Sequence, residues 1–165
     1  PNAPVKVEIY SDFQCPYCRD FTETYEKRLV TDLVSTGKVY MTYIPFKVIG
    51  PESDTAAMGA LCAADQNKFW EMHDILFANQ GAENSGVFTE RRVKAMAEKI
   101  SGLDVNQFNS CLSSNKYSDQ LAQNETKGTQ AGVDSTPSFI VNGQLLKNVQ
   151  LSDVENQIRA AVPAQ

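Results

Sequence analysis

Residues 5–18 read VKVEIYSDFQCPYC and contain a change from one type of secondary structure to another. From Val5 to Tyr10, β-branched and aromatic side chains alternate with polar ones, and this period of two residues predicts a β-strand. From Cys15 onward the period becomes helical. Apolar side chains recur every four residues at Phe21, Tyr25, Leu29 and Leu33. The cysteine pair Cys15 and Cys18 therefore lies where a predicted strand ends and a predicted helix begins.

The segments around this helix predict a βαβ unit. Gly37 is a suitable C-terminal stop for the helix, and residues 39–46 again have the composition of a strand. A strand, a helix and a second strand in this order predict a parallel, right-handed arrangement.

The C-terminal region predicts a hairpin followed by a helix. Residues 138–141 and 144–149 have strand character, and the intervening Asn142-Gly143 suits a type I′ turn. We expect Ser152 to cap a last helix that ends at about Val162.

Between these regions Ala, Met, Leu, Glu and Gln dominate and β-branched runs disappear, which predicts helices. The predicted helices cover residues 53–66, 67–78, 89–101, 104–114 and 116–131, with Thr89 as an N-cap. One sheet needs both of its parts to close a core. We therefore expect residues 1–50 and 133–165 to form a discontinuous α/β domain, with residues 51–132 inserted as a helical domain.

Length and composition exclude several classes of protein. The chain has 165 residues, of which 42% are hydrophobic and 21% charged, as in a globular protein of one domain or one domain with an insertion. Its net charge of −5 opposes nucleic-acid binding, which needs a basic face. No stretch approaches the ~20 apolar residues of a membrane span. The chain begins with Pro1 and lacks signal-peptide features, so we interpret it as a mature or trimmed form.

The position of the CPYC motif favours a reactive thiol. The first turn of a helix has unpaired N–H groups and the positive end of the helix dipole, and both stabilise a thiolate at Cys15. Pro16 suits this turn because its missing N–H is not needed there. We expect Cys15 to be the attacking thiolate and Cys18, further into the helix and more buried, the resolving thiol. A stabilised thiolate makes the disulfide easier to donate.

Two other interpretations of the motif are a structural disulfide and half of a zinc site. A structural zinc site usually needs a second C-x-x-C pair or two histidines. The chain has neither, because its remaining cysteines are isolated and His73 is its one histidine. The sequence therefore favours redox chemistry, with no metal.

Three segments resemble the DsbA-like thiol–disulfide oxidoreductases of the thioredoxin superfamily. Residues 10–18 resemble the family's active-site segment, residues 132–139 its cis-proline loop, and residues 69–77 a helix of its inserted domain. The resemblance runs from Val5 to Val162. It implies an α/β fold, namely a thioredoxin fold with an inserted helical domain.

The resemblance also implies the site and its partners. Site residues would be Cys15, Pro16, Tyr17, Cys18, Thr136 and Pro137. The Thr136–Pro137 bond would be cis, and the Thr136 backbone would pair with an extended substrate peptide. No cofactor beyond the Cys15–Cys18 disulfide is implied. Substrates would be unfolded or partly folded cysteine-containing proteins outside the cytoplasm, and the reoxidant a membrane protein of the DsbB or VKOR type.

Cys62 and Cys111 fall in two different predicted helices. A disulfide between them would close a loop of about 50 residues and stabilise the fold by ~4 kcal/mol in the chain-entropy model. Two buried reduced thiols are the alternative. The resemblance to exported proteins favours a structural disulfide.

Two further residues bear on the predicted site. Members of the superfamily often hold a buried acid beneath the cysteines, and Glu8, on the strand leading into the motif, is the candidate for that position. For His73, among aromatic residues in a predicted helix, we expect a packing or surface role.

The sequence supports three functional hypotheses. The first is an oxidase that introduces disulfides into secreted or envelope proteins. The second is a disulfide isomerase or reductase, because Tyr17 replaces the histidine of the strongest oxidants and Thr136 precedes the proline. The third is a peptide-binding or holdase module that keeps the cysteines only as a staple. No segment is spare for dimerisation, so we expect a monomer.

Overall fold

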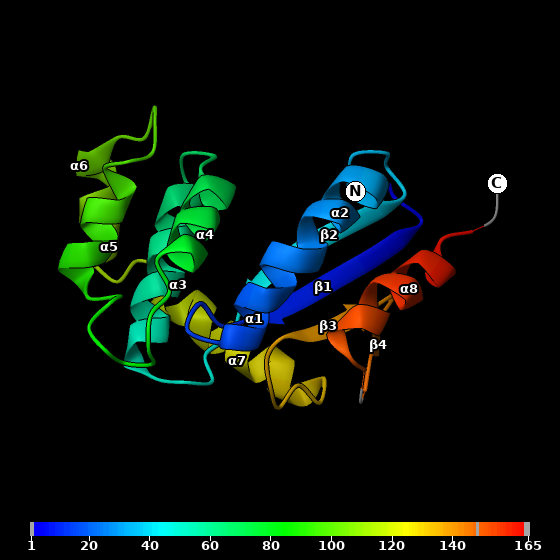
Figure 1. Ribbon diagram of the computed structural model, residues 1–165. Helices are drawn as coiled ribbons and strands as arrows, with labels where there is room; N and C mark the ends of the chain where they lie inside the picture. The colour runs from blue at the N-terminus through cyan, green and yellow to red at the C-terminus, as the bar shows by residue number, and fades with distance from the viewer. Residues whose placement is uncertain (1, 148, 164–165) are drawn as a thin grey trace.

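The computed structural model describes residues 2–147 and 149–163 and contains a four-stranded sheet in the order β2-β1-β3-β4 (Figure 1). Its strands are β1 (Val5–Ser11), β2 (Val39–Pro45), β3 (Ser138–Val141) and β4 (Gln144–Leu145). β1 pairs with β2 in parallel and with β3 antiparallel, and β3 pairs antiparallel with β4. The N-terminal βαβ unit and the C-terminal hairpin therefore share one sheet, as expected.

One continuous helical run connects β1 to β2. It consists of α1 (Pro16–Phe21), η1 (Thr22–Glu26), α2 (Lys27–Leu29) and η2 (Val30–Val34), of which η1 and η2 are wider, π-helical turns. Gly37, with φ of 73°, follows its end. The helix predicted from Cys15 to about Ser35 is confirmed, but the two wide turns are not visible in the spacing of its apolar residues.

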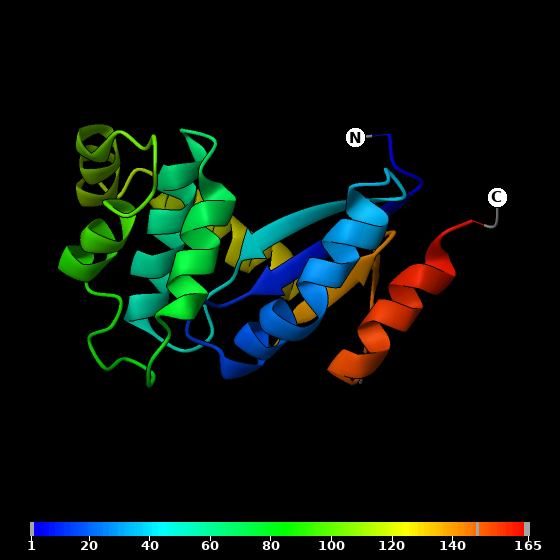
Figure 2. The same ribbon diagram turned by 45° about the horizontal axis from the view of Figure 1, so that its top comes forward.

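Helices cover both faces of the sheet (Figure 2). On one face, the helical run from α1 to η2 and α8 (Leu151–Ala161) pack on the side chains of Val5, Val7 and Ile9. On the other face lies α7 (Ser118–Gln130), where Gly128 meets the sheet. A Cβ at Gly128 would come within 2.5 Å of the Phe46 ring, so a glycine is required for this close approach.

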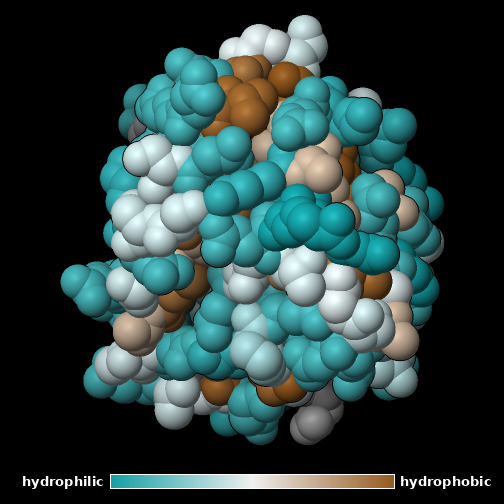
Figure 3. Space-filling view, turned by 90° about the vertical axis from the view of Figure 1, so that its left-hand side faces the viewer, coloured by the Kyte–Doolittle hydropathy of each residue, from teal (hydrophilic) through white to brown (hydrophobic). Residues whose placement is uncertain are grey.

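The other helices form a second buried cluster beyond the end of the sheet toward which β1 points (Figure 1). They are α3 (Pro51–Ala64), α4 (Phe69–Ala78), α5 (Glu90–Ala97) and α6 (Val105–Ser113). Phe13, Cys15 and Cys18 belong to this cluster, so the CPYC segment lies between the sheet and the helices. On the face over α5 and α6, hydrophilic residues predominate and hydrophobic ones form small separate areas (Figure 3).

Several predicted boundaries need correction. Helix α8 begins at Leu151 with Gln150 as its N-cap, so Ser152 lies inside the first turn and the predicted cap is wrong. Thr89 does occupy the N-cap of α5, but its side chain makes no capping hydrogen bond. Strand β4 ends at Leu145, well short of the predicted Val149. Residue 148 lies outside the described residues.

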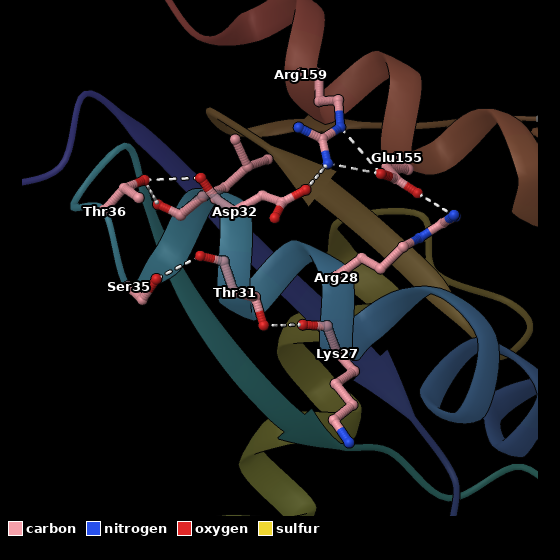
Figure 4. A network of polar contacts seen from close by, with 9 residues as sticks. Lys27, Arg28, Thr31, Asp32, Ser35, Thr36, Glu155 and Arg159 are labelled. Atoms are coloured by element: carbon pink, nitrogen blue, oxygen red, sulfur yellow. Dashed lines mark hydrogen bonds and ion pairs between the residues drawn. The ribbon is translucent and has the colours of Figure 1, made fainter.

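An ionic network fixes α8 to the helix that follows the CPYC motif (Figure 4). The buried Glu155 accepts hydrogen bonds from Arg28 at 2.6 Å and from Arg159 at 2.8 and 3.0 Å. Arg159 also donates to Asp32 at 2.5 Å. A buried carboxylate needs such partners, so this network joins the two helices on the same face of the sheet.

Candidate active site

The end of β1 and the start of α1 place the two cysteines. Cys15 is the N-cap of α1 and Pro16 follows at its first position, as the sequence predicts. The Cys15 carbonyl accepts from the backbone N–H groups of Cys18 at 3.1 Å and Arg19 at 3.2 Å. Both cysteines are unpaired thiols. Their side chains therefore belong to the first turn of one helix.

The buried carboxylate of Asp12 shapes the loop before Cys15. One oxygen accepts from the Gln14 N–H at 2.9 Å, and the other from the N–H groups of Val48 at 2.8 Å and Ile49 at 3.0 Å. It thus holds the segment after β2 against the active-site loop. This role of Asp12 was not predicted from the sequence, although an Asp between a strand and a helix is a signal for such a loop.

Side chains from the helical region also hold this loop. The side-chain amide of Gln80, just after α4, donates to the Phe13 carbonyl at 2.7 Å and to the Cys15 carbonyl at 3.0 Å. Gln14 donates to Ser53 at 3.0 Å and accepts from the Asn84 N–H at 2.6 Å. The position of Cys15 is therefore set by contacts from α3 and the segment after α4 as well as by β1.

The thiol of Cys15 is acidic. Its pKa is lowered from 9.0 to about 6, first by a hydrogen bond from the Cys18 thiol, against the opposing effect of burial. The Thr136 side chain and the backbone N–H groups of Cys18 and Tyr17 lower it further. The helix terminus contributes as the sequence predicts, but the neighbouring thiol contributes most.

The thiol of Cys18 has the opposite property. It is only 1% exposed, against 5% for Cys15. Burial raises its pKa well above the ordinary value, and the hydrogen bond to Cys15 and the charge of that thiolate raise it further. At neutral pH Cys18 therefore keeps its proton while Cys15 gives up its own.

The loop before β3 completes the site. The peptide bond between Thr136 and Pro137 is cis. The Thr136 carbonyl lies 3.2 Å from the Cys15 Sγ and accepts a hydrogen bond from it when Cys15 is protonated. Tyr17, between the two cysteines, is 65% exposed. The structure thus brings Cys15, Cys18 and Thr136 together and leaves an aromatic side chain in solvent beside them.

This arrangement agrees with known proteins. A family model described as thioredoxin matches residues 1–160. The chain belongs to the thioredoxin family. A protein of Bacillus anthracis named "Probable disulfide bond formation protein D" is 33% identical over 147 residues, which cover 87% of this chain and 68% of that protein.

Two solved structures are similar over almost the whole chain. Oxidised BdbD from Bacillus subtilis has a TM-score of 0.86 and 20% identity, covering 97% of this chain and 88% of its own. Oxidised DsbA from Mycobacterium tuberculosis has a TM-score of 0.77 and 26% identity, covering 98% and 84%. The expected DsbA-like thioredoxin fold is confirmed, and the chain is a DsbA-like thiol–disulfide oxidoreductase.

The position of Glu8 in this DsbA-like protein differs from the expectation. Side chains alternate along β1, and Val7 and Ile9 face the helical run from α1 to η2. Glu8 therefore points to the opposite face, where it is half-buried. The pKa of the neighbouring Tyr10 is raised first by burial and then by the charge of Glu8. The interpretation of Glu8 as the acid beneath the cysteines is wrong, because it has the wrong parity on the strand.

Glu26, at the end of η1, is a buried acid that was not predicted from the sequence. Its residue is 5% exposed, and burial raises the pKa of its carboxyl. It faces His73, whose Nε2 lies 3.5 Å from the Glu26 carboxylate. His73 is fully buried, so its predicted packing role describes only part of its environment.

Cys62 in α3 and Cys111 in α6 form a disulfide, with 5.8 Å between their Cα atoms. It ties two helices of the second cluster. Among the described residues, no group of three or more His, Cys, Asp or Glu side chains could hold a metal ion. In the same part of the chain, no helix is both long enough and apolar enough to cross a membrane.

Proposed function

We propose that this oxidoreductase transfers a disulfide between Cys15 and Cys18 to cysteine-containing proteins that are unfolded or partly folded. The observation that carries the proposal is the contrast between the two thiols. Cys15 has a pKa lowered to about 6, whereas the pKa of Cys18 is raised well above its ordinary value. A sulfur that is stable as a thiolate is a good leaving group, so the Cys15 disulfide is readily passed on.

The reaction proceeds in two exchanges. A substrate thiolate attacks the Cys15 sulfur, the Cys15–Cys18 bond breaks, and its electron pair goes to Cys18. A second substrate thiolate then attacks the substrate sulfur of the mixed disulfide and releases Cys15 as a thiolate. The substrate has lost two electrons and two protons overall, and the enzyme leaves as a dithiol.

The remaining residues have supporting roles in this proposal. The Thr136 backbone, next to the Cys15 sulfur, pairs with an extended substrate segment. Pro137 has no backbone N–H, so it does not compete with the substrate for hydrogen bonds. Pro16 starts the helix, and the exposed Tyr17 contacts the substrate. Residues 1–50 and 133–165 act as the redox domain, and residues 51–132 as an inserted domain that supports it. One buried cluster is formed only by residues of the ranges 1–50 and 133–165, which supports this division. Another is formed by residues of the range 51–132 together with Phe13, Cys15 and Cys18.

We place the reaction outside the cytoplasm, in the cell envelope or as a secreted activity. The Cys62–Cys111 disulfide supports this, because structural disulfides are rare in a reducing compartment. The protein acts as a monomer. A membrane protein of the DsbB or VKOR type reoxidises it, in line with its family resemblance.

One observation favours a second candidate, a disulfide reductase or isomerase. Tyr17 stands between the cysteines and offers no positive charge to the Cys15 thiolate. The couple would then be less oxidising than one with a cation at that position. Equilibration with glutathione distinguishes the two, because a reductase has a much lower reduction potential.

Oxidative refolding of reduced, unfolded ribonuclease tests the proposal. We expect the wild-type protein, with excess oxidised glutathione as the oxidant, to accelerate the recovery of ribonuclease activity, and Cys15→Ser to reduce the rate to that of glutathione alone. A Cys15→Ser variant as active as the wild type would contradict it, and would favour a peptide-binding module that does not use the cysteines.

A further inference from the structure

Gln80 joins the inserted helices to the loop that carries Cys15. It follows the C-cap of α4, and its backbone N–H donates to the Phe77 carbonyl of that helix at 3.1 Å, which anchors its main chain. Its half-buried side chain donates from Nε2 to the carbonyl oxygens of Phe13 at 2.7 Å and Cys15 at 3.0 Å. A single amide group therefore binds two carbonyls of the active-site loop.

The Cys15 carbonyl has more donors than it needs. It already accepts the backbone N–H groups of Cys18 at 3.1 Å and Arg19 at 3.2 Å, which are the first hydrogen bonds of α1. A carbonyl oxygen has two lone pairs, so these two bonds satisfy it. The amide of Gln80 is a third donor. It is therefore not required to pair a buried oxygen, and its effect is to fix the direction in which that oxygen points.

The direction of this carbonyl is coupled to the position of the Cys15 sulfur. Cys15 is the N-cap of α1 and has extended backbone angles, with φ of −74° and ψ of 120°. Its ψ is the rotation between its own side chain and the helix that bears Cys18. The next residue, Pro16, has its φ locked by the ring and cannot compensate for a change in ψ. By holding the carbonyl oxygen, Gln80 therefore restrains the Cys15 side chain relative to Cys18.

Ring contacts give this restraint a rigid support. Phe13 is only 1% exposed, and its ring centroid lies 5.1 Å from that of Phe77 and 5.9 Å from that of His73, both on α4. The same helix thus holds Phe13 by its ring, and Gln80 holds it by its carbonyl. The amide that binds the Cys15 carbonyl is therefore fixed at both of its sides by packed elements.

The need for such a restraint differs between the redox states. In the oxidised protein, the bond between Cys15 and Cys18 itself holds the Cys15 side chain against α1. In a mixed disulfide, only noncovalent contacts hold it, and rotation about its ψ moves its sulfur away from Cys18. Holding two reacting groups in the right geometry accelerates the step that joins them. Gln80 should therefore act mainly on the attack of Cys18 on a mixed disulfide at Cys15.

We propose that Gln80 is a positioning residue that keeps Cys15 within reach of Cys18 while Cys15 carries a mixed disulfide. This inference rests on the proposed exchange at Cys15 and Cys18. In the step concerned, the Cys18 thiol loses its proton to solvent and attacks the Cys15 sulfur. The bond from Cys15 to the partner sulfur breaks, and the partner leaves with the electron pair as a thiolate. By favouring this closure, Gln80 shortens the lifetime of mixed disulfides.

Equilibration with reduced and oxidised glutathione isolates this step. Mass spectrometry of acid-quenched samples gives the amounts of the Cys15–Cys18 disulfide and of the Cys15–glutathione disulfide. Their ratio, multiplied by the concentration of reduced glutathione, is the effective concentration of Cys18. It is independent of the Cys15 pKa, because Cys15 is disulfide-bonded in both species. Gln80→Met keeps the length of the side chain and removes the amide. We expect it to lower this effective concentration about tenfold, the size of one or two neutral hydrogen bonds.

The matched control is Gln66→Met. The Gln66 amide also bonds to the backbone of a distant segment, donating to the Asp104 carbonyl at 3.0 Å and accepting from the Asp104 N–H at 2.6 Å. This variant should lose unfolding free energy as Gln80→Met does, but keep the wild-type effective concentration of Cys18. Gln80→Ala removes the side chain without adding bulk and should reproduce the tenfold loss. It keeps the test valid if Gln80→Met does not fold.

A wild-type effective concentration in the Gln80 variants would overturn the positioning role. An equal loss in Gln66→Met would overturn it too, because the effect would then follow from lower stability alone. Both outcomes leave the proposed function intact, since the wild-type protein still loads glutathione on Cys15 and closes. A wild-type protein that forms neither disulfide with glutathione would contradict the proposed function and the role of Gln80 together.

Discussion

Replacing Cys18 with Ser is expected to give a protein that reacts once with a disulfide and then stops. The acidic Cys15 remains available to form a mixed disulfide, but the chain no longer has a thiol beside it to resolve that bond. Mixed with an unfolded protein that contains a disulfide, the variant should accumulate a covalent adduct. Non-reducing electrophoresis and mass spectrometry of the adduct would measure it, and catalysed refolding should fall to the background rate.

The matched control is Cys15→Ser. Its one remaining active-site thiol is buried and keeps its proton, so no adduct should form. An adduct at Cys18 in that variant, or wild-type turnover by Cys18→Ser, would show that the roles of the two cysteines are assigned the wrong way round.

Removing the Cys62–Cys111 disulfide is expected to destabilise the fold by about 4 kcal/mol, since the bond closes a long loop between cysteines 49 positions apart in sequence. In the chain-entropy model the loss arises in the unfolded state, which gains conformations when the loop opens. The double variant Cys62→Ala/Cys111→Ala, unfolded in urea beside the wild type, measures the difference in unfolding free energy.

A reductant provides the control for this experiment. In dithiothreitol the wild type loses the same bond, so most of the difference between the two proteins should disappear. An undiminished difference would mean that packing of the two sulfur atoms, and not the covalent link, stabilises α3 against α6.

Much of this fold could be predicted from local sequence. Alternation in β1, the four-residue spacing after Cys15 and the Asn142-Gly143 turn each act over a few residues, so their signals are present in the sequence. Both turn residues have positive φ, at 49° and 81°, as a type I′ turn requires. The preference of proline for the first position of a helix likewise predicted Pro16 at the start of α1.

Other features depend on contacts between distant segments and were missed. Glu26 differs from the exposed Glu23 on the same turn only because α4 covers it, and no spacing rule indicates which face of a helix an insertion will cover. Gln80 reaches the active-site loop across 65 residues of chain. The orientation of Glu8, in contrast, could have been predicted. Side chains alternate along a strand, so Val7 and Ile9 on one face place Glu8 on the other.

The claim on which the account depends is the acidity of the Cys15 thiol. Its pKa is lowered to about 6, so the thiolate stabilises the reduced protein fully above pH 9, and this stabilisation is lost as the pH falls through 6. The direct measurement is a titration of the reduced protein by thiolate absorbance at ultraviolet wavelengths, with Cys15→Ser as the blank. The account predicts that one thiolate, absent from the blank, is half-formed near pH 6. Half-formation near pH 9, as for an ordinary cysteine, would contradict it.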